Sequence, residues 1–324
     1  MKKSSFQRGE HTPRDHYADV TAKIIAALDS GVPPWRCQWD KTKAGGPMMP
    51  QNATTGARYR GINTLILGGS MMAFANGDAR WATYKQAAEQ GWQVQAGSRG
   101  TTGYFYKRLE VDGGDGEDGR FIPMLRSFTL FHASQIDGIP SYMPPTIEEA
   151  PWREPEAAAI IADNSGAVIH IGGDRAFYSP STDHIQLPPV FAFHSAASIA
   201  SVKLHELGHW TGHPSRLKRD LKNKFGSHDY AREELRAEIA TVMICSELGI
   251  GDCEFTNGAA YIADWASKLR EDKKEIFRAA SDAQRIADYL LAFHPDYAAK
   301  HQVAHDDAVP SARSQERAEI AEAA

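Results

Sequence analysis

The sequence contains few cysteines and no long apolar run, and each absence excludes a class of protein. Its 324 residues include three cysteines, with no CxxC pair among them. Such a set is too small for a disulfide framework and is expected to consist of buried or incidental thiols in a reducing compartment. No apolar run approaches the about 18 residues that a membrane-spanning helix needs, and the N-terminus lacks the apolar segment of a secretion signal. We therefore expect a cytoplasmic protein with no membrane partner.

The composition is that of an ordinary globular protein. Hydrophobic residues make up 42% of the chain and charged residues 24%, which is enough for a buried core and a solvated surface. The length of 324 residues exceeds the usual size of one domain. Two domains are therefore the first expectation.

The net charge of −5 conceals an asymmetry between the two halves of the chain. Residues 1–140 hold 17 Lys or Arg against 13 Asp or Glu, whereas the remainder holds 19 against 28. The stretch from Arg36 to Arg108 is more basic still, with ten bases and three acids. A basic first half and an acidic second half predict different partners for the two.

The pattern of the first half predicts a mixed α+β domain. Helices are expected at 17–28 and 83–90, where apolar residues recur at helical spacing and Gly or Pro follows. The Gly/Asp-rich residues 112–119 suit a hairpin connection. Strands are predicted at the alternating segments 92–96, 103–111 and 121–131.

The second half is predicted to be mostly helical with a small sheet. A helix at 156–165 precedes a strand at 168–171 and an extended stretch at 176–187. That stretch would suit an edge strand that pairs with a peptide, although an ordinary sheet edge is the simpler interpretation. Further helices are expected at 196–211, 230–248, 258–270 and 274–293.

The segment 141–155 is dense in proline and acid and is the best linker candidate. Residues 300–324 have few apolar side chains and are expected to be a disordered tail or a frayed helix. The expected division is a flexible N-terminus at 1–14, a first domain at 15–140, the linker at 141–155, a second domain at 156–299 and the tail at 300–324.

The sequence His205-Glu206-Leu-Gly-His209 is an HExxH motif inside a predicted helix. A separation of four residues places both imidazoles on one helix face, where a single metal ion can bind them. Zinc prefers imidazole and carboxylate ligands, and a catalytic zinc site leaves one position to water. Glu206 cannot easily reach the same ion and is instead the expected general base.

Two arrangements compete for the third ligand. In the metzincin pattern Gly212 falls in place, but the ligand position is Ser215, which is not a credible zinc ligand. His213 follows His209 by four residues, yet Gly212 and Pro214 should end the helix, so a surface or supporting histidine is the simpler interpretation.

The gluzincin arrangement takes its third ligand from a following helix. Glu234 and Glu238 share one face of the helix at 230–248, with Glu233 directed elsewhere. A solvated acidic stripe near a helix N-terminus would explain the same residues. Next to the HExxH motif we predict Glu234 as the ligand and Glu238 as a supporting residue or alternative ligand. Zn²⁺ is the expected ion, with another divalent ion such as Mn²⁺ as an alternative.

The basic stretch of the first half is also rich in aromatic residues. Aromatic rings stack on unpaired bases and Lys or Arg neutralises phosphates, so this mixture is typical of single-stranded nucleic-acid binding. About half of the rings are expected to form the core of a small domain instead. The predicted DNA-binding residues are Arg36, Trp39, Arg58, Tyr59, Arg60, Asn63, Trp81, Lys85, Lys107 and Arg108.

Co-linear segments over about residues 15–295 carry a family resemblance. In the first half they are PPWRCQW (33–39), TGARYRGINTLIL (55–67), WATYKQAAEQGWQV (81–94) and FTLFHASQIDGIP (128–140). In the second half they are YSPSTDHIQLPP (178–189), LHELGHWTGHPSRLKRDL (204–221) and YAREELRAEIA (230–240). Together they resemble the ArdC-type antirestriction proteins of conjugative plasmids, whose N-terminal module is shared with TraC-type plasmid primases.

The resemblance implies a single-stranded-DNA-binding domain joined to a zincin-like metallopeptidase domain, acting in the cytoplasm to protect incoming DNA from restriction enzymes. The chain departs from the family at His132 and Ala133, where Asn and a small apolar residue are expected. Residues 113–119 look like a local insert. Neither departure touches the metal motif.

The leading hypothesis is therefore an α+β antirestriction protein of two domains. A small α+β domain binds single-stranded DNA, and a mostly helical, gluzincin-like domain with a small sheet holds the metal. A restriction-modification subunit or another protein is the expected peptidase substrate. One alternative is a DNA-binding decoy whose metal site is only structural or regulatory, because a zincin fold can keep its metal without proteolysis. The other is a metallopeptidase without DNA affinity.

Overall fold

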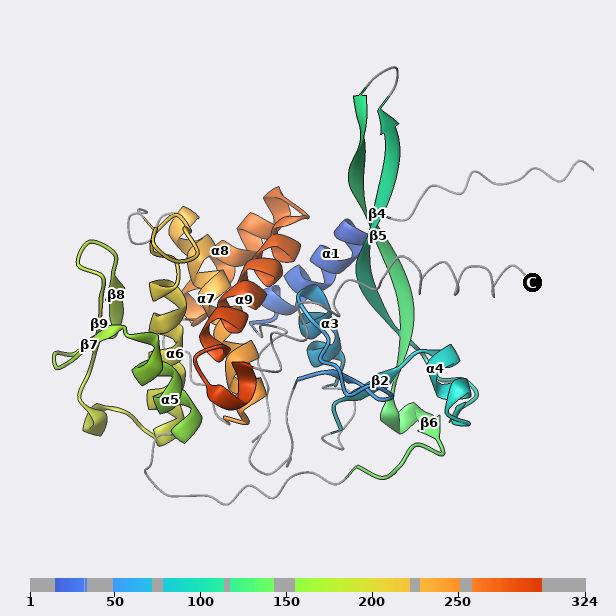
Figure 1. Ribbon diagram of the computed structural model, residues 1–324, viewed down its shortest axis with the longest axis horizontal. Coiled ribbons are helices and arrows are strands. Elements are labelled where there is room, and N and C mark those ends of the chain that lie inside the picture. The colour runs from blue at the N-terminus through green and yellow to red at the C-terminus, as the bar shows by residue number, and fades with distance from the viewer. Residues whose placement is uncertain are drawn as a thin grey trace, which may run out of the picture.

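The computed structural model describes residues 15–31, 33, 49–71, 78–113, 117–142, 155–221, 228–250 and 258–298. Helices and strands are mixed, and the strands form three small sheets in the described ranges. The predicted α+β class is confirmed. In Figure 1 the helices of the second half gather on one side, the first half lies on the other, and a long hairpin projects from it.

The first half combines short helices with a four-stranded sheet in the order β1-β2-β5-β4 and a separate β3-β6 pair. A capping box between Thr83 and Gln86 starts α4 and explains why so short a helix forms. Helix α3 occupies an apolar segment to which the sequence pattern assigned no helix. The elements are α1 (His16–Asp29), β1 (Gln51–Asn52), α3 (Ile62–Met71), β2 (Arg80–Ala82), α4 (Tyr84–Glu89), β3 (Gln93–Val94), β4 (Thr101–Gly113), β5 (Glu117–His132), η1 (Ala133–Gln135) and β6 (Ile136–Asp137).

Strands β4 and β5 form an antiparallel hairpin that extends beyond the sheet (Figure 1). Their pairing runs from Thr101 opposite Leu130 to Gly113 opposite Glu117. The predicted strands 103–111 and 121–131 are confirmed but shorter than the observed ones. Backbone pairing continues past the alternating side chains because ladder hydrogen bonds do not depend on side-chain type.

The second half is mostly helical with a three-stranded sheet at its outer edge beside α6, and the predicted helical character and small sheet are confirmed (Figure 1). The stretch 176–187 is not one strand, however, because a turn with Asp183 at φ 50° divides it into the antiparallel strands β8 and β9. The sheet order β7-β9-β8 leaves β8 at the edge. The elements are α5 (Glu156–Ser165), β7 (Val168–Ile171), β8 (Phe177–Ser179), β9 (His184–Leu187), η2 (Val190–Ala192), α6 (Ala196–Trp210), α7 (His228–Leu248), α8 (Gly258–Glu271) and α9 (Glu275–Leu291).

The largest hydrophobic cluster draws residues from both halves. Val20, Ile24 and Leu28 of α1 and Leu65 of α3 are buried in it together with side chains of α6, α7, α8 and α9. Helix α1 lies along α8, and α3 contacts α9. The proposed division into domains stays a prediction, since residues 143–154 of the linker, the N-terminus and the tail lie outside the described residues.

Ion pairs add to the contact between the halves. Arg270 of α8 binds Asp29 at 2.6 Å, and Lys273 binds Asp15. The hydroxyl of Thr21 donates to the carbonyl oxygen of Lys273 at 2.7 Å. The two exposed pairs contribute little energy by themselves, so the shared apolar cluster is the main source of cohesion.

No helix in the described ranges is both long enough and apolar enough to cross a bilayer. Of the three cysteines, Cys245 is described, and it is a buried thiol in α7. Cys37 and Cys253 lie outside the described residues.

Candidate metal centre

Helix α6 presents the HExxH motif toward α7. Ser195 caps the helix, accepting a hydrogen bond from the Ser198 backbone N–H at 3.0 Å. Leu204 and Leu207 are fully buried and fix which face of the helix enters the core. His205 and His209 occupy adjacent turns of another face, as their spacing predicts.

Three side chains converge between α6 and α7. The Nε2 atoms of His205 and His209 are 3.1 Å apart, and they lie 3.5 and 3.3 Å from the Oε2 and Oε1 atoms of Glu234. A tetrahedral ion with ligand bonds of about 2.0–2.1 Å would require donors about 3.3 Å apart. The spacing and the donor types therefore fit a divalent metal ion without rearrangement. Within the described ranges, these three residues are the cluster of His, Cys, Asp or Glu that could hold one.

Glu206 is buried beside these donors. Only 7% of the residue is exposed, and it lines the same cavity as both histidines. Tyr178 of strand β8 lines this cavity as well. The sheet edge and the proposed general base are therefore held next to one another.

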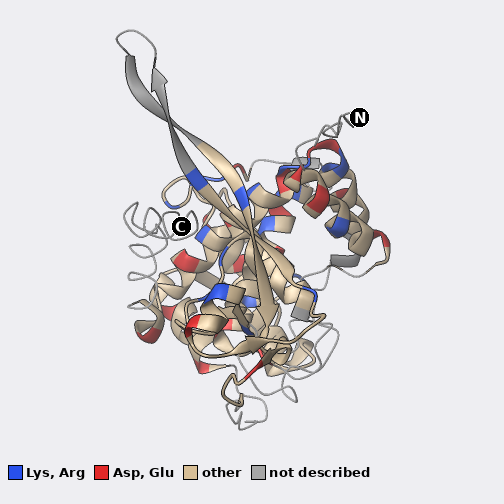
Figure 2. Cartoon of the chain, turned by 90° about the vertical axis from the view of Figure 1, so that its right-hand side faces the viewer, with Lys and Arg blue, Asp and Glu red and all other residues tan. Residues whose placement is uncertain are grey.

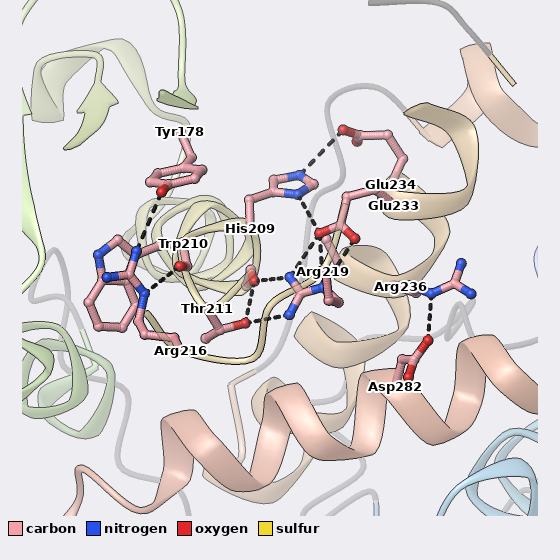
Figure 3. A network of polar contacts seen from close by, with 12 residues as sticks. Tyr178, His209, Trp210, Thr211, Arg216, Arg219, Glu233, Glu234, Arg236 and Asp282 are labelled. Atoms are coloured by element: carbon pink, nitrogen blue, oxygen red, sulfur yellow. Dashed lines mark hydrogen bonds and ion pairs between the residues drawn. The ribbon is translucent and has the colours of Figure 1, made fainter. Parts of the chain in front are cut away.

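Glu233 also faces the centre, so the prediction that it points elsewhere is wrong. Its Oε1 lies 3.3 Å from His209 Nδ1, on the side of the ring opposite the converging atoms. Arg219 holds the same carboxylate with Nη2 at 2.8 Å and Nε at 3.1 Å (Figure 3). A carboxylate behind a ligating imidazole fixes its tautomer and orientation. Glu233 thus has the supporting position for which the sequence suggested Glu238.

Arg219 itself is anchored on α6. Its Nη1 donates to the Thr211 hydroxyl at 2.8 Å and its Nη2 to the Gly208 carbonyl at 2.7 Å (Figure 3). Gly212 leaves room for this guanidinium, because a Cβ atom there would lie 3.0 Å from Nη2 of Arg219 and 2.9 Å from Cδ1 of Leu221. No sequence motif marked Arg219, and the signal that could have found it is an arginine in the loop that joins the two helices of the site.

Glu238 is buried, with 3% exposed, and lines the cavity one turn beyond Glu234. It is not among the three converging residues. Burial and the nearby Glu234 carboxylate raise the pKa of Tyr230, whose ring lies 5.8 Å from that of Tyr261. Helix α7 is braced from behind by Arg236, whose Nε donates to Asp282 of α9 at 2.8 Å (Figure 3).

The histidines and glutamates of the candidate metal centre shift one another's pKa values. Burial lowers the pKa of His209, but the Glu234 and Glu233 carboxylates outweigh it and raise that pKa well above its usual value. Burial raises the pKa of Glu234, but His209 and His205 hold it well below its usual range. Burial also raises the pKa of the Glu206 carboxyl. A carboxylate with a raised pKa is suited to accept and hold a proton.

A second network fastens the sheet to the end of α6. The Arg216 guanidinium lies 3.8 Å from the centre of the Trp210 ring, and its Nε donates to the Trp210 carbonyl at 2.6 Å. Arg216 also forms an ion pair with Asp183 in the β8–β9 turn, and the Tyr178 hydroxyl donates to Asp183 at 2.8 Å. Figure 3 shows Tyr178, Arg216 and Trp210 side by side. Strand β8 is thereby fixed against the HExxH helix.

A cavity of about 1190 Å³ opens at the centre. Its lining is largely apolar and aromatic outside the donors, and Phe191 of η2 is 89% exposed at its edge. Such a volume accommodates a ligand much larger than an ion. The aromatic residues that line it are Phe177, Tyr178, Phe191, Phe193, Tyr230, Tyr261 and Trp265.

Two of the predicted DNA-binding arginines instead bind carboxylates of the second half. Arg58 Nε lies 3.0 Å from Oε2 of Glu247 on α7, and Arg60 forms an ion pair with Asp288 on α9. The Glu247 side chain is 7% exposed. In this structure both guanidinium groups are therefore part of the contact between the halves.

Three other predicted residues are engaged within the first half. Trp81 is fully buried in a small core cluster, so its ring cannot stack on a base in this conformation. The Asn63 side chain accepts from the Tyr104 N–H at 2.8 Å and donates to the Tyr104 carbonyl at 2.6 Å, which ties α3 to β4. Burial of Tyr59 raises its pKa to about 12.

The remaining predicted residues are scattered. Lys85 is exposed on α4, and Lys107 is partly exposed on β4. Arg36, Trp39 and the Arg108 side chain lie outside the described residues. The part of these residues in DNA binding stays a prediction.

Family models match the two halves separately. Residues 14–131 match the N-terminal domain of the anti-restriction factor ArdC, and residues 155–282 match a zincin-like metallopeptidase domain. The segment between the two matches, 132–154, contains all of the predicted linker except residue 155.

Similar curated proteins include two DNA primases TraC of Escherichia coli. They are 43% and 44% identical over 307 and 295 residues, which is 89% and 86% of this chain. The chain spans about a quarter of their length, 21% and 27%. The uncharacterized protein y4eC of Sinorhizobium fredii is 37% identical over 89% of this chain and 95% of its own length. The TraC matches run through both halves, further than the N-terminal module that the sequence resemblance led us to expect.

Solved structures of the antirestriction protein ArdC from plasmid R388 are similar over nearly their whole length. The metal-free form has a TM-score of 0.76 with 36% identity, covering 88% of this chain and 99% of that one. The Mn(II)-bound form has a TM-score of 0.73 with the same identity, covering 88% and 100%.

Proposed function

The chain belongs to the ArdC-type antirestriction proteins, and on this premise we propose that it protects incoming DNA during conjugative transfer. Its first half binds single-stranded DNA, and its second half, a zincin-like domain, is a metal-dependent peptidase. A divalent metal ion is the cofactor for which this domain is built. The cytoplasm is where incoming DNA and restriction enzymes meet.

The convergence of His205, His209 and Glu234 carries the peptidase proposal. Two imidazole nitrogens and a carboxylate lie within 4.8 Å of one another, with buried Glu206 beside them. A solvated acidic stripe would not explain this, because the acids of α7 at this point are buried and face the histidines. This donor set is typical of zinc peptidases, and Mn²⁺ can occupy the same ligands.

The protein groups divide the work of peptide hydrolysis. His205, His209 and Glu234 would hold the ion, which when bound supplies Lewis acidity to polarise a peptide carbonyl. Glu206 takes the proton from the attacking water and returns it to the leaving amine. Glu233 and Arg219 keep the His209 ring in place. The large apolar cavity receives the substrate chain, for which a restriction-modification subunit is the proposed source.

The DNA-binding proposal is supported by charge and by relatives. The stretch 36–108 carries ten bases and three acids among many aromatic residues. The first half matches the N-terminal domain of an anti-restriction factor and part of two DNA primases. All of these relatives are named for work on DNA or its protection.

The test compares the wild type with Glu206→Ala in a transfer assay. Recipient cells with an active restriction system receive unmodified DNA, and the surviving transferred DNA is counted. Because a general base contributes about 10²–10⁴ to a rate, the variant should lose protection while its metal content stays unchanged. A matched Glu271→Ala variant, in an exposed side chain of α8, should protect like the wild type. Full protection by Glu206→Ala with full metal content would reject the peptidase and leave the metal a structural or regulatory role.

A further inference from the structure

The β4–β5 hairpin has one face held against the body of the protein. Tyr104 is buried there, with its ring 5.4 Å from that of His16 and 6.2 Å from that of Phe277. The Tyr106 hydroxyl lies 3.1 Å from the Tyr17 hydroxyl of α1, and Leu125 packs against the main core. These contacts fix the orientation of the hairpin on helix α1 and the second half.

The residues that alternate with Tyr104 and Tyr106 on β4, and their partners on β5, lie on the opposite face of the hairpin. This follows because side chains alternate along a strand and paired residues share a face. The observed register pairs Gly103 with Phe128, Phe105 with Arg126, and Lys107 with Met124. We call these six residues the hairpin face. Arg126 is exposed, and so is Phe105, at 40%. Exposure of Phe105 is notable because phenylalanine side chains are usually buried.

Two aromatic rings lie side by side on the hairpin face. The centroids of Phe105 and Phe128 are 5.9 Å apart. The Phe128 ring lies directly over Gly103, where a Cβ atom would come within 2.7 Å of it. Glycine at this position therefore lets the ring lie flat on the ladder. Arg126 stands directly across the ladder from Phe105, with their Cβ atoms about 5 Å apart.

We propose that the hairpin face is the surface on which this protein binds single-stranded DNA. The proposal rests on the proposed DNA-binding function and assigns it a place. A base stacks on Phe105, which has a free ring face at the surface, and Arg126 neutralises an adjacent phosphate. Phe128 and Gly103 support the Phe105 ring, and Lys107 adds a second positive charge at the same level of the hairpin.

Charge favours a nucleic acid over a protein as the occupant. The described side chains of the two strands, at 101–107 and 123–132, include Lys107 and Arg126 and no Asp or Glu. Figure 2 shows basic positions on this part of the hairpin where it leaves the body of the protein. Duplex DNA is a poorer fit, since base faces are exposed for stacking only in unpaired strands.

Residues 58–60, which the sequence analysis predicted as DNA contacts, offer a contrasting surface. Arg58 and Arg60 already bind Glu247 and Asp288, so phosphates would have to displace carboxylates of the protein itself. Arg126 forms no ion pair with the described residues. On the hairpin face, Phe105 and Arg126 are exposed together without such competition.

The experiment measures the affinity of the full chain for an oligothymidylate of about 16 nucleotides by fluorescence anisotropy at several salt concentrations. Phe105→Ala should weaken binding by about 5- to 150-fold, the range for loss of one stacked base. Phe105→Tyr keeps the ring and should restore affinity, whereas Phe105→Leu keeps only the apolar character and should not. Arg126→Ala should reduce the slope of log affinity against log salt by about 0.7.

The matched control is the double variant Tyr84→Ala with Lys85→Ala. It removes an exposed ring and an exposed base from α4 in the same half, and Lys85 was itself a predicted DNA contact. We expect its affinity to stay within a factor of two of the wild type. Melting temperature and metal content, measured on every variant, should not change, because the substituted residues Phe105 and Arg126 are exposed and are not metal donors.

The outcomes separate this proposal from the function on which it rests. If wild type binds and Phe105→Ala binds equally well, the hairpin face is wrong and DNA binding stands. If only the Tyr84→Ala and Lys85→Ala control weakens, the surface lies on α4. If the wild type does not bind the oligonucleotide at all, the proposed function itself fails. A Phe105→Ala variant that changes only self-association would reassign the face to contact with a second copy.

Discussion

In the α6–α7 helix pair the candidate metal donors are largely buried and His209 is held by a second residue, whereas on the β4–β5 hairpin Phe105 and Arg126 are exposed. His209 has Glu233 behind it and Glu233 has Arg219, so the ring has one orientation. Phe105 has a neighbouring ring and an open face. The first arrangement suits an ion with strict geometry, and the second suits a flexible chain that adapts to the surface.

This difference predicts how each region responds to substitution. Changes in the helix pair should alter metal affinity steeply, because a displaced donor cannot be replaced. Substitution of Phe105 or Arg126 on the hairpin should alter affinity for DNA and leave metal content and melting temperature unchanged. Substitutions at the contact between the halves should alter stability.

The largest effect is expected from Glu234→Ala. Loss of one of three converging donors should reduce metal affinity by more than about 100-fold, since even supporting residues cost 10- to 100-fold. Metal content after dialysis against a chelator series measures this. Retention of metal at wild-type affinity would show that another carboxylate, such as the alternative ligand Glu238, supplies the third ligand.

A smaller effect on the same centre is expected from Glu233→Gln. The amide keeps the shape of the side chain but loses the charge that faces His209 and Arg219. Metal affinity should fall by about 10- to 100-fold, with the fold unchanged in circular dichroism. A variant with wild-type metal affinity would mean that Glu233 serves only to hold Arg219.

Arg58→Ala should affect stability more than it affects DNA binding. It leaves buried Glu247 without its guanidinium partner, which should lower the free energy of unfolding by about 1–2 kcal/mol. Urea denaturation measures this change, with Arg285→Ala, an exposed residue of α9, as the control. If Arg58→Ala instead matched Phe105→Ala in lost DNA affinity at unchanged stability, the loop and not the hairpin would be the binding surface.

The smallest expected effect is on how the free energy of unfolding depends on pH, through the ion pair between Asp183 and Arg216 at the end of α6. The Arg216 side chain holds the pKa of Asp183 below its usual value of 3.8. A depressed carboxyl pKa adds stability above the unfolded pKa, and this contribution is lost as the pH falls through the folded one. Asp183→Asn should therefore flatten the loss of stability below about pH 4, by less than about 1 kcal/mol because the side chain is 38% exposed.

The arrangement of the two histidines on α6 was well predicted because it depends only on residues within one helix. The spacing of His205 and His209 within one helix sets their separation, and it requires no knowledge of the fold. The role of Glu234 stays a prediction, although the packing of α7 on α6 brings it to the two imidazoles. Glu233 was misjudged because successive residues differ by about 100° on a helix, and both can face a groove that lies between them.

The first half was harder to predict because surfaces are products of tertiary structure. A positive charge in the sequence does not reveal whether its partner is a phosphate or a carboxylate, and Arg58 and Arg60 found carboxylates on α7 and α9. Trp81 is an aromatic residue in a basic region, yet burial of a large ring is the stronger preference. Phe105 and Arg126 become neighbours only through the register of the hairpin.

The cluster that α1 and α3 share with the helices of the second half bears on how such chains can be inherited. A first half released on its own would expose the faces of α1 and α3 that carry Val20, Ile24, Leu28 and Leu65. Recombination that separated the halves would therefore yield a fragment prone to aggregate, whereas their joint transfer keeps these apolar faces covered. The similarity to TraC primases, which runs through both halves within much longer proteins, is what joint transfer would leave behind.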